Sequence, residues 1–512
     1  MLADRRTKIV ATIGPATKSK ENLRKAIMSG MNVARLNFSH GTHEDHLSVI
    51  KILRELSIEM NAPITILQDL QGPKIRVGKF DTETKTITLG EGDRVIITTE
   101  NVMGKPGLIP TDFKDLPKTA MPGNRIMLDD GLMELRIESV EGNHVHCTVV
   151  YGGVLKERKG MNVPGGSIGI DCLTEKDLRD LDFGLENAVD YVALSFVRRG
   201  DDIRQLQDII KRKAPGTRIV AKIEMLEAID NLEEIVRLSD AVMVARGDLA
   251  VEVGQTRLPQ IQKQIVRLCN RIGTPVITAT QMLDSMTENP RPTRAEITDV
   301  ANAVLDGSDA LMLSAESASG KYPFKCIQTM HEIISEVERN GDYFYNMSLD
   351  SEFFSVAEAI GAAASLTALK LNASAIVCLT TSGRTASIIS SFRPKARIIA
   401  VTHILPTLNR LELVWGIQGL VIDPYTSSDQ AMSQIEEMLI KYGLVKTGDK
   451  VVLTLGVPVL ERGKTNALRV YTVGREDARR LSEKDLPLRC KDSVVLPGRV
   501  EASERPETTD RV

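Results

Sequence analysis

Eight short apolar runs recur along the chain, and most are followed by a segment that predicts a helix. Nearly continuous apolar runs are typical of parallel strands that are covered on both faces. The helical segments include 43–61, 227–238 and 322–340. The predicted strands span 8–14, 32–38, 64–70, 191–196, 218–223, 241–246, 275–280 and 310–314.

The rhythm changes after the third strand. Residues 72–164 alternate apolar and polar positions between Gly- and Asn-rich turns, which predicts a separate all-β module. The eight βα units around it predict the α/β class and a closed (β/α)₈ TIM barrel with this module inserted after strand 3. A doubly wound open sheet remains possible from the hydrophobic pattern alone.

A smaller α/β domain is predicted after the barrel, because four further strand candidates alternate with helices over 342–472. The barrel itself is expected to occupy 1–71 and 165–341. The last segment, 473–512, mixes acidic and basic residues with one short apolar patch. This composition predicts a mostly disordered tail.

Polar residues cluster where the apolar runs end, and this placement favours the barrel over the open sheet. In a barrel, the carboxyl ends of all strands form one face, and that face carries the chemistry. The residues concerned are Arg35, Asn37, Asp69, Ser195, Lys222, Glu224, Arg246, Asp248, Thr280, Ser314 and Glu316.

These side chains suit the transfer of a phosphoryl group. Glu224 and Asp248 offer the oxygen ligands that Mg²⁺ prefers, and Lys222 offers a compact positive charge. Arg35 and Arg76 can each bind a phosphate through two N–H groups. The chain has no GxxxxGK[ST] motif, so a P-loop is not expected to hold the nucleotide. The alternative is that the strand-end charges form a structural ion-pair network.

Composition limits the kinds of partner and the cellular compartment that can be expected for this chain. The formal net charge of −3 gives no reason to expect nucleic acid or an anionic membrane as a partner. No apolar run has the length of a signal peptide core or a membrane span. The six cysteines are scattered without a CxxC pair, which suits a reducing compartment. A cytoplasmic protein is therefore expected.

Several strings give the chain a close resemblance to the pyruvate kinase family from residue 6 to about residue 470. They include MNVARLNFSHG (31–41), DLQGPKIRVG (69–78), IVAKIE (219–224), MVARGDLAVE (243–252) and NPRPTRAE (289–296). The resemblance implies that the phosphoryl group of phosphoenolpyruvate passes to ADP, giving pyruvate and ATP. It also implies Mg²⁺ or Mn²⁺ as the divalent metal, a β-barrel lid as the inserted module, and a homotetramer.

The resemblance assigns roles to residues of this chain. Lys222 is the implied catalytic lysine, Arg35 the phosphoryl ligand, and Glu224 and Asp248 the metal ligands. Gly247, Asp248 and Thr280 are implied to bind the substrate carboxylate. The implied nucleotide contacts are Asn37, His40, Arg76 and Lys159, and Ser314 and Glu316 match residues near the relay that protonates the enolate.

The family usually requires a monovalent cation, at positions that match Asn37, Ser39, Asp69 and Leu70. Potassium-dependent members carry a threonine where this chain has Leu70 and a glutamate where it has Lys74. The chain therefore resembles the potassium-independent branch, in which the Lys74 ammonium supplies the charge of the missing ion. The alternative is that Lys74 is a solvated surface lysine and that K⁺ still binds.

The string LTTSGRTA in the C-terminal domain resembles the phosphate loop of the family's allosteric site. The residues that would bind an effector phosphate are Thr380, Ser382, Gly383, Arg384 and Thr385. Thr381 replaces a lysine of some fructose-bisphosphate-regulated members, which leaves another sugar phosphate or AMP as the effector. An ordinary strand-to-helix turn with Ser and Thr caps is an equal alternative.

Two other functions compete with the kinase. One is a lyase or aldolase that uses a similar barrel and Mg²⁺, although the phosphate-binding residues Arg76 and Lys159 would have no purpose there. The other is a non-catalytic binding protein, against which the intact set of Lys222, Glu224 and Asp248 speaks.

Overall fold

The computed structural model describes residues 5–164, 171–339, 355–457 and 465–474. The described residues up to Val473 belong to one compact unit. The predicted disordered tail lies outside the described residues, apart from its first two positions. Within the described ranges, no helix is long and apolar enough to cross a membrane.

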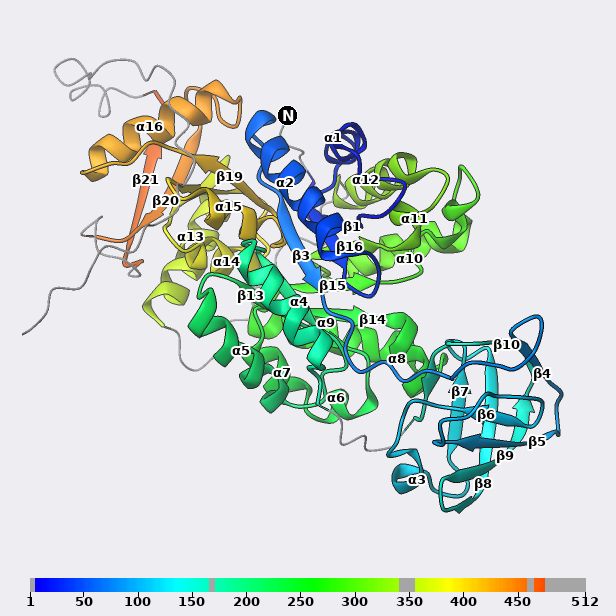
Figure 1. The fold of residues 1–512 in the computed structure, drawn as a ribbon. Coiled ribbons are helices and arrows are strands. Elements are labelled where there is room, and N and C mark those ends of the chain that lie inside the picture. The colour runs from blue at the N-terminus through cyan, green and yellow to red at the C-terminus, as the bar shows by residue number, and fades with distance from the viewer. Residues whose placement is uncertain (1–4, 165–170, 340–354, 458–464, 475–512) are drawn as a thin grey trace, which may run out of the picture. The chain divides into compact units, whose positions relative to one another are not determined.

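The eight predicted strands form a closed parallel barrel (Figure 1). The first strand pairs with the last, with Lys8 opposite Ala310, so the open-sheet alternative is wrong. The strands neighbour one another in the order β1-β16-β15-β14-β13-β12-β3-β2. Their bounds are β1 (Lys8–Thr12), β2 (Val33–Asn37), β3 (Thr65–Asp69), β12 (Tyr191–Leu194), β13 (Arg218–Ile223), β14 (Ala241–Ala245), β15 (Val276–Ala279) and β16 (Ala310–Leu313).

The main barrel helices follow the predicted pattern with one difference. The segment 227–238 forms two helices instead of one, because the chain breaks at Asn231, whose side-chain amide donates to the carbonyls of Arg198 and Glu227. The helices are α1 (Lys20–Met28), α2 (His43–Glu59), α4 (Glu175–Glu186), α5 (Gly200–Lys213), α6 (Leu226–Asp230), α7 (Leu232–Leu238), α9 (Leu258–Ile272), α10 (Arg294–Leu305) and α12 (Pro323–Arg339).

Three short helical turns that the hydrophobic pattern did not predict lie at the carboxyl ends of strands. Helix α8 (Arg246–Val253) follows β14 without a loop, the 3₁₀ turn η1 (Asp284–Thr287) lies after β15, and α11 (Ala315–Ala318) follows β16. The Arg-Gly-Asp string therefore forms the first turn of a helix, where backbone N–H groups have no acceptor within the helix.

The inserted module, residues 72–164, is built from strands with its own apolar core. It contains a six-stranded sheet, a two-stranded sheet and one short helix, α3 (Leu116–Thr119). The pairing of β8 and β9 shifts register twice, which interrupts a regular ladder. The strands are β4 (Thr86–Leu89), β5 (Arg94–Thr98), β6 (Leu108–Pro110), β7 (Arg125–Leu128), β8 (Met133–Glu141), β9 (His144–Tyr151), β10 (Gly153–Lys156) and β11 (Met161–Asn162).

The C-terminal domain has a sheet in the order β19-β18-β17-β20-β21. The four predicted strands are parallel, and β21 adds an antiparallel edge that was not predicted. The elements are α13 (Val356–Leu371), β17 (Ala375–Leu379), α14 (Arg384–Ser391), β18 (Arg397–Thr402), α15 (Leu405–Leu411), β19 (Ile417–Val421), α16 (Ser428–Lys441), β20 (Lys450–Leu455) and β21 (Ala467–Thr472).

This domain contacts the amino ends of the barrel strands. The ammonium of Lys8, the first residue of β1, lies 3.2 Å from Glu412 and donates to the carbonyl of Ile417. Arg393 pairs with Asp309 at 3.1 Å and lies over the ring of Trp415. These contacts cover one end of the barrel, and the predicted site residues lie at the opposite ends of the strands.

Candidate active site

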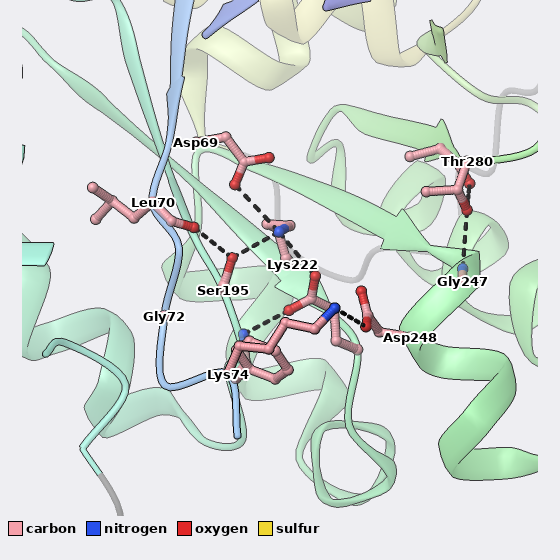
Figure 2. A network of polar contacts seen from close by, with 12 residues as sticks. Asp69, Leu70, Gly72, Lys74, Ser195, Lys222, Gly247, Asp248 and Thr280 are labelled. Carbon is pink, nitrogen blue, oxygen red and sulfur yellow. Dashed lines mark hydrogen bonds and ion pairs between the residues drawn. The ribbon is translucent and has the colours of Figure 1, made fainter. Parts of the chain in front are cut away.

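Lys222 is at the centre of a polar network at the end of β13 (Figure 2). Its Nζ donates to Ser195 Oγ at 2.7 Å and lies 2.9 Å from Glu224 Oε1 and 3.2 Å from Asp69 Oδ1. Its side chain is only 12% exposed. Burial disfavours the ammonium, but the carboxylates of Asp69 and Glu224 outweigh burial and raise the pKa of Lys222. Lys222 therefore stays charged in a largely enclosed place.

Arg35 is held beside Lys222 by the same buried carboxylate. Its Nε donates to Asp69 Oδ2 at 2.7 Å, and its Nη1 donates to Thr12 Oγ1 at 2.9 Å. Burial favours the neutral acid at Asp69, but the charges of Lys222 and Arg35 hold the pKa of this carboxyl below its usual value. One carboxylate thus orients two cations towards the end of the barrel.

Glu224 and Asp248 supply a donor set that fits Mg²⁺. Glu224 is 1% exposed, and its Oε2 accepts from the Phe196 N–H at 2.7 Å. Burial raises the pKa of the Glu224 carboxyl, the Lys222 ammonium lowers it, and the nearby charge of Asp248 adds to the rise. A divalent cation would relieve this repulsion. Among the described residues no group of three or more His, Cys, Asp or Glu side chains could hold a metal, and Mg²⁺ typically needs only one or two carboxylates beside water and phosphate.

Lys74, at the start of the inserted module, reaches one of these two carboxylates, that of Asp248. Its Nζ lies 3.8 Å from Asp248 Oδ1 (Figure 2). The same Nζ lies 3.4 Å from Asp130 Oδ1. The Lys74 side chain is 28% exposed, so it is not a fully solvated surface lysine. A positive charge from the inserted module is therefore present next to a predicted metal ligand.

Gly247 and Thr280 contact each other directly. The Gly247 N–H donates to Thr280 Oγ1 at 2.9 Å, and this hydroxyl donates to the Ala279 carbonyl at 2.7 Å. Thr280 and the next residue, Gln281, both have positive φ, at 69° and 52° respectively. A β-branched residue rarely adopts this conformation, and nothing in the sequence indicated it.

The Glu316 carboxylate binds backbone groups, one of which belongs to Ser314. Glu316 is 1% exposed and accepts from the N–H groups of Ser314 at 2.7 Å and Leu283 at 3.2 Å. Burial raises the pKa of this carboxyl. These contacts join the end of β16 to the segment after Thr280, so the observed bonds of Glu316 are to amides of the site's loops.

The predicted nucleotide residues form two groups. Arg76 and Lys159 belong to the inserted module, where Arg76 Nη1 donates to the Arg158 carbonyl at 3.0 Å and Lys159 lies 2.8 Å from Asp129. The other two follow the end of β2. Asn37 Oδ1 accepts from the Ser39 N–H at 3.1 Å, and the carbonyl of His40 contacts the ring of His46.

Two residues of the predicted monovalent-cation site, Asp69 and Leu70, already bind other groups of the protein. Both oxygens of Asp69 face cations, as described above. Leu70 is buried, and its carbonyl accepts from Ser195 Oγ at 2.8 Å. Its side chain offers no oxygen where potassium-dependent members have a threonine. These contacts favour the prediction that K⁺ is not required.

The predicted effector loop lies between β17 and α14. Gly383 has a φ of 83°, and its N–H donates to Thr380 Oγ1 at 2.9 Å. Thr385 shares a hydrogen bond with Thr465, whereas Ser382 and Arg384 are exposed. The Thr380 hydroxyl serves the turn itself, and the Thr385 hydroxyl is bonded to Thr465. Only the exposed pair could therefore meet a phosphate without rearrangement.

Two contributions to the site were missed by sequence reasoning. Ser195, noted only as a strand-end residue, connects Lys222 to the Leu70 carbonyl. The backbone N–H of Phe196, a residue with a φ of 57°, binds Glu224. The position of Ser195 was a usable signal, but a backbone amide has no signature in a sequence.

Comparisons with known proteins agree with the fold described above. Family models described as "Pyruvate kinase, barrel domain" and "Pyruvate kinase, alpha/beta domain" match residues 4–327 and 358–471. Pyruvate kinases of Staphylococcus aureus strains MRSA252 and USA300 are each 42% identical over 478 residues, which is 93% of this chain and 81% of theirs. A crystal structure of a pyruvate kinase from Cryptosporidium parvum superposes with a TM-score of 0.87 at 35% identity, covering 92% of this chain and 96% of that one.

Proposed function

The chain belongs to the pyruvate kinase family of phosphotransferases, and on this premise we propose that it carries the phosphoryl group of phosphoenolpyruvate to ADP with the help of Mg²⁺. The observation that carries the proposal is the position of Lys222, enclosed between the carboxylates of Asp69 and Glu224 at the end of the barrel. In the reaction, the P–O bond of phosphoenolpyruvate breaks, an oxygen of the ADP β-phosphate forms the new bond, and the enolate gains a proton.

The cations at the strand ends would act on the charge that moves. Arg35, oriented by Asp69, would bind the phosphoryl oxygens through N–H groups. Lys222 would neutralise the phosphoryl group and then the developing enolate. Because both cations are held by hydrogen bonds in a largely enclosed site, little reorganisation is needed as charge develops.

Glu224 and Asp248 would hold the divalent metal, which when bound neutralises phosphate charge. The substrate carboxylate would lie near Thr280 and the first turn of α8, where the Gly247 N–H now binds the Thr280 hydroxyl. Arg76 and Lys159 would contact the nucleotide phosphates from the inserted module. Closure of that module would exclude water, which would otherwise accept the phosphoryl group.

A coupled assay of pyruvate formation tests the proposal against its alternatives. The kinase forms pyruvate only when phosphoenolpyruvate, ADP and Mg²⁺ are all present. A lyase would release product without ADP, and a binding protein would show no turnover. Either result would reject the proposed function.

We expect turnover to be nearly unchanged when K⁺ is replaced by a large organic cation, because Lys74 already places a charge near Asp248. The double variant Leu70→Thr/Lys74→Glu restores the residue types of potassium-dependent members. It should lose about 100-fold in turnover without K⁺, the scale for one electrostatic contact, and recover when K⁺ is added. Initial rates over a K⁺ titration measure both effects.

Lys79→Glu is the matched control, since Lys79 is an exposed lysine in the same segment. It makes the same change of charge as Lys74→Glu, and the variant should respond to K⁺ as the wild-type enzyme does. Strong activation of the wild-type enzyme by K⁺ would contradict the role of Lys74.

We propose that the loop 380–385 binds a phosphorylated effector in a homotetramer, as the family resemblance implies. Sugar phosphates and AMP should be screened for activation of the enzyme. Allosteric coupling typically changes affinity by at least about fivefold, and Arg384→Ala should abolish a response of this size. Lys395→Ala, which removes an exposed cation from the same domain, should keep it. An effector response that survives in Arg384→Ala would favour the ordinary strand-to-helix turn.

A further inference from the structure

The segment after β15 has an unusual backbone for a substrate-binding loop. Thr280 and Gln281 are consecutive residues with positive φ, at 69° and 52°. Such conformations persist only where the surrounding structure imposes them, and they concentrate at functional sites. The Thr280 hydroxyl is also the acceptor of the Gly247 N–H, so its direction depends on this strained backbone.

The guanidinium of Arg246 binds this segment at several points. Its Nε lies 3.1 Å from the Ala279 carbonyl and 3.2 Å from the Thr280 carbonyl. Its Nη2 donates to the Thr280 carbonyl at 2.5 Å and contacts the sulfur of Met282 at 2.9 Å. Arg246 therefore holds the carbonyls of the two peptide units that flank the Thr280 side chain.

A third residue fixes the guanidinium itself. Asp299, on α10, accepts from Arg246 Nη1 through both carboxylate oxygens, at 2.9 and 2.8 Å. The Arg246 side chain is 9% exposed, whereas that of Asp299 is 36% exposed. The carboxylate thus balances a buried charge and sets the plane of the guanidinium. A lysine could not reproduce this fork of donors.

From these contacts we infer that Arg246 is a positioning residue, which holds Thr280 in its strained conformation and thereby orients the Thr280 hydroxyl and the Gly247 amide for the substrate carboxylate. Arg246 also begins α8, so one residue joins both halves of this subsite. The inference deepens the proposed function and rests on it. Its role differs from that of Lys222, because the guanidinium acts through the backbone.

The inference predicts that substitutions of Arg246 or Asp299 lower kcat/KM for phosphoenolpyruvate but leave KM for ADP unchanged. Arg246→Lys should lower kcat/KM for phosphoenolpyruvate by about 100-fold, the cost of a misplaced contact group, while KM for ADP stays unchanged. Asp299→Asn should lower it by about 10-fold, because the guanidinium remains but is less well oriented. The fluorescence of Trp415, the chain's single tryptophan, reports whether each variant is folded.

A second substitution separates positioning from simple charge balance. Gly adopts positive φ without strain, so Gln281→Gly should relax the segment and recover about 10-fold of the loss in Arg246→Lys. Gln281→Ala removes the same exposed side chain without this freedom and should recover nothing. Equal recovery by Ala and Gly, no recovery by Gly, or a matching rise in KM for ADP would overturn the inference.

Binding of oxalate in the presence of Mg²⁺ keeps this test apart from the proposed function. Oxalate resembles the enolate of pyruvate in size and carries the carboxylate that this subsite would hold. Calorimetry should show that the wild type binds oxalate most tightly and that Arg246→Lys/Gln281→Gly comes second. Arg246→Lys and Arg246→Lys/Gln281→Ala should bind oxalate most weakly and with equal affinity. If the wild type forms no pyruvate, the proposed function fails, and the oxalate order still decides whether Arg246 positions the loop. Equal affinities in all four proteins would reject the inference.

Discussion

Replacing Lys222 with methionine is expected to lower kcat by about 1000-fold or more, on the scale of losing a charge that stabilises a phosphoryl-transfer transition state. The Lys222 ammonium is within 3.2 Å of two carboxylates and a hydroxyl. Methionine has a similar length but no charge, so it fills the space without stabilising the phosphoryl group or the enolate. Steady-state rates of pyruvate formation measure the loss.

The same substitution leaves Asp69 and Glu224 buried without their shared cation. Breaking a buried ion pair typically costs about 3–5 kcal/mol, so the free energy of unfolding should fall as well. Denaturant unfolding followed by Trp415 fluorescence distinguishes lost stability from lost chemistry. Lys20→Met, at an exposed lysine of α1, is the control and should change neither quantity appreciably. Near-full activity in a folded Lys222→Met protein would refute the catalytic role.

Asp248→Asn should raise the Mg²⁺ concentration needed for half-maximal activity by about 100-fold or more, since even residues behind metal ligands change affinity by 10- to 100-fold. The amide keeps the shape of the side chain but loses the charge that complements a divalent cation. The charge of Asp248 also contributes to the raised pKa of Glu224, so the substitution should ease ionisation of the remaining ligand. Rates over a Mg²⁺ titration at saturating substrate measure the shift.

Asp130→Asn is a matched control for this experiment. Asp130 lies close to the same Lys74 ammonium, but it belongs to the inserted module and is 68% exposed. If Asp248 acts only by pairing with Lys74, both variants should behave alike. A Mg²⁺ requirement that stays at the wild-type value in Asp248→Asn would remove Asp248 from the metal site.

The barrel was predictable because its eight strands are covered on both faces and therefore appear as separate apolar runs. Shorter or more exposed elements could not be predicted in this way. Helix α8 has buried residues but only two turns, so the pattern after β14 gave it no distinct period. The edge strand β21 is largely exposed or half-buried, and it lacks the apolar run by which buried strands are recognised.

For the candidate site, charged side chains could be predicted and backbone geometry could not. Lys222, Glu224 and Asp69 were expected together because each ends a strand of the barrel, and the structure brings them into contact. The positive φ of Thr280 depends on Arg246, which lies at the start of α8, more than 30 residues earlier in the chain. Such a conformation is set by tertiary contacts, so local sequence carries no sign of it.

The pairing of β1 with β16 has a consequence for synthesis of the protein. About 300 residues separate Lys8 from its partner Ala310. At roughly 5–20 residues per second, a ribosome needs about 15–60 seconds to make that stretch. For this time the nascent barrel has unpaired strand edges, which are prone to pair with other chains. The inserted module has its own core and is complete much earlier, so it can fold while the barrel around it is still waiting for its last strand. Efficient production of this enzyme should therefore depend on chaperones that shield the growing half-barrel.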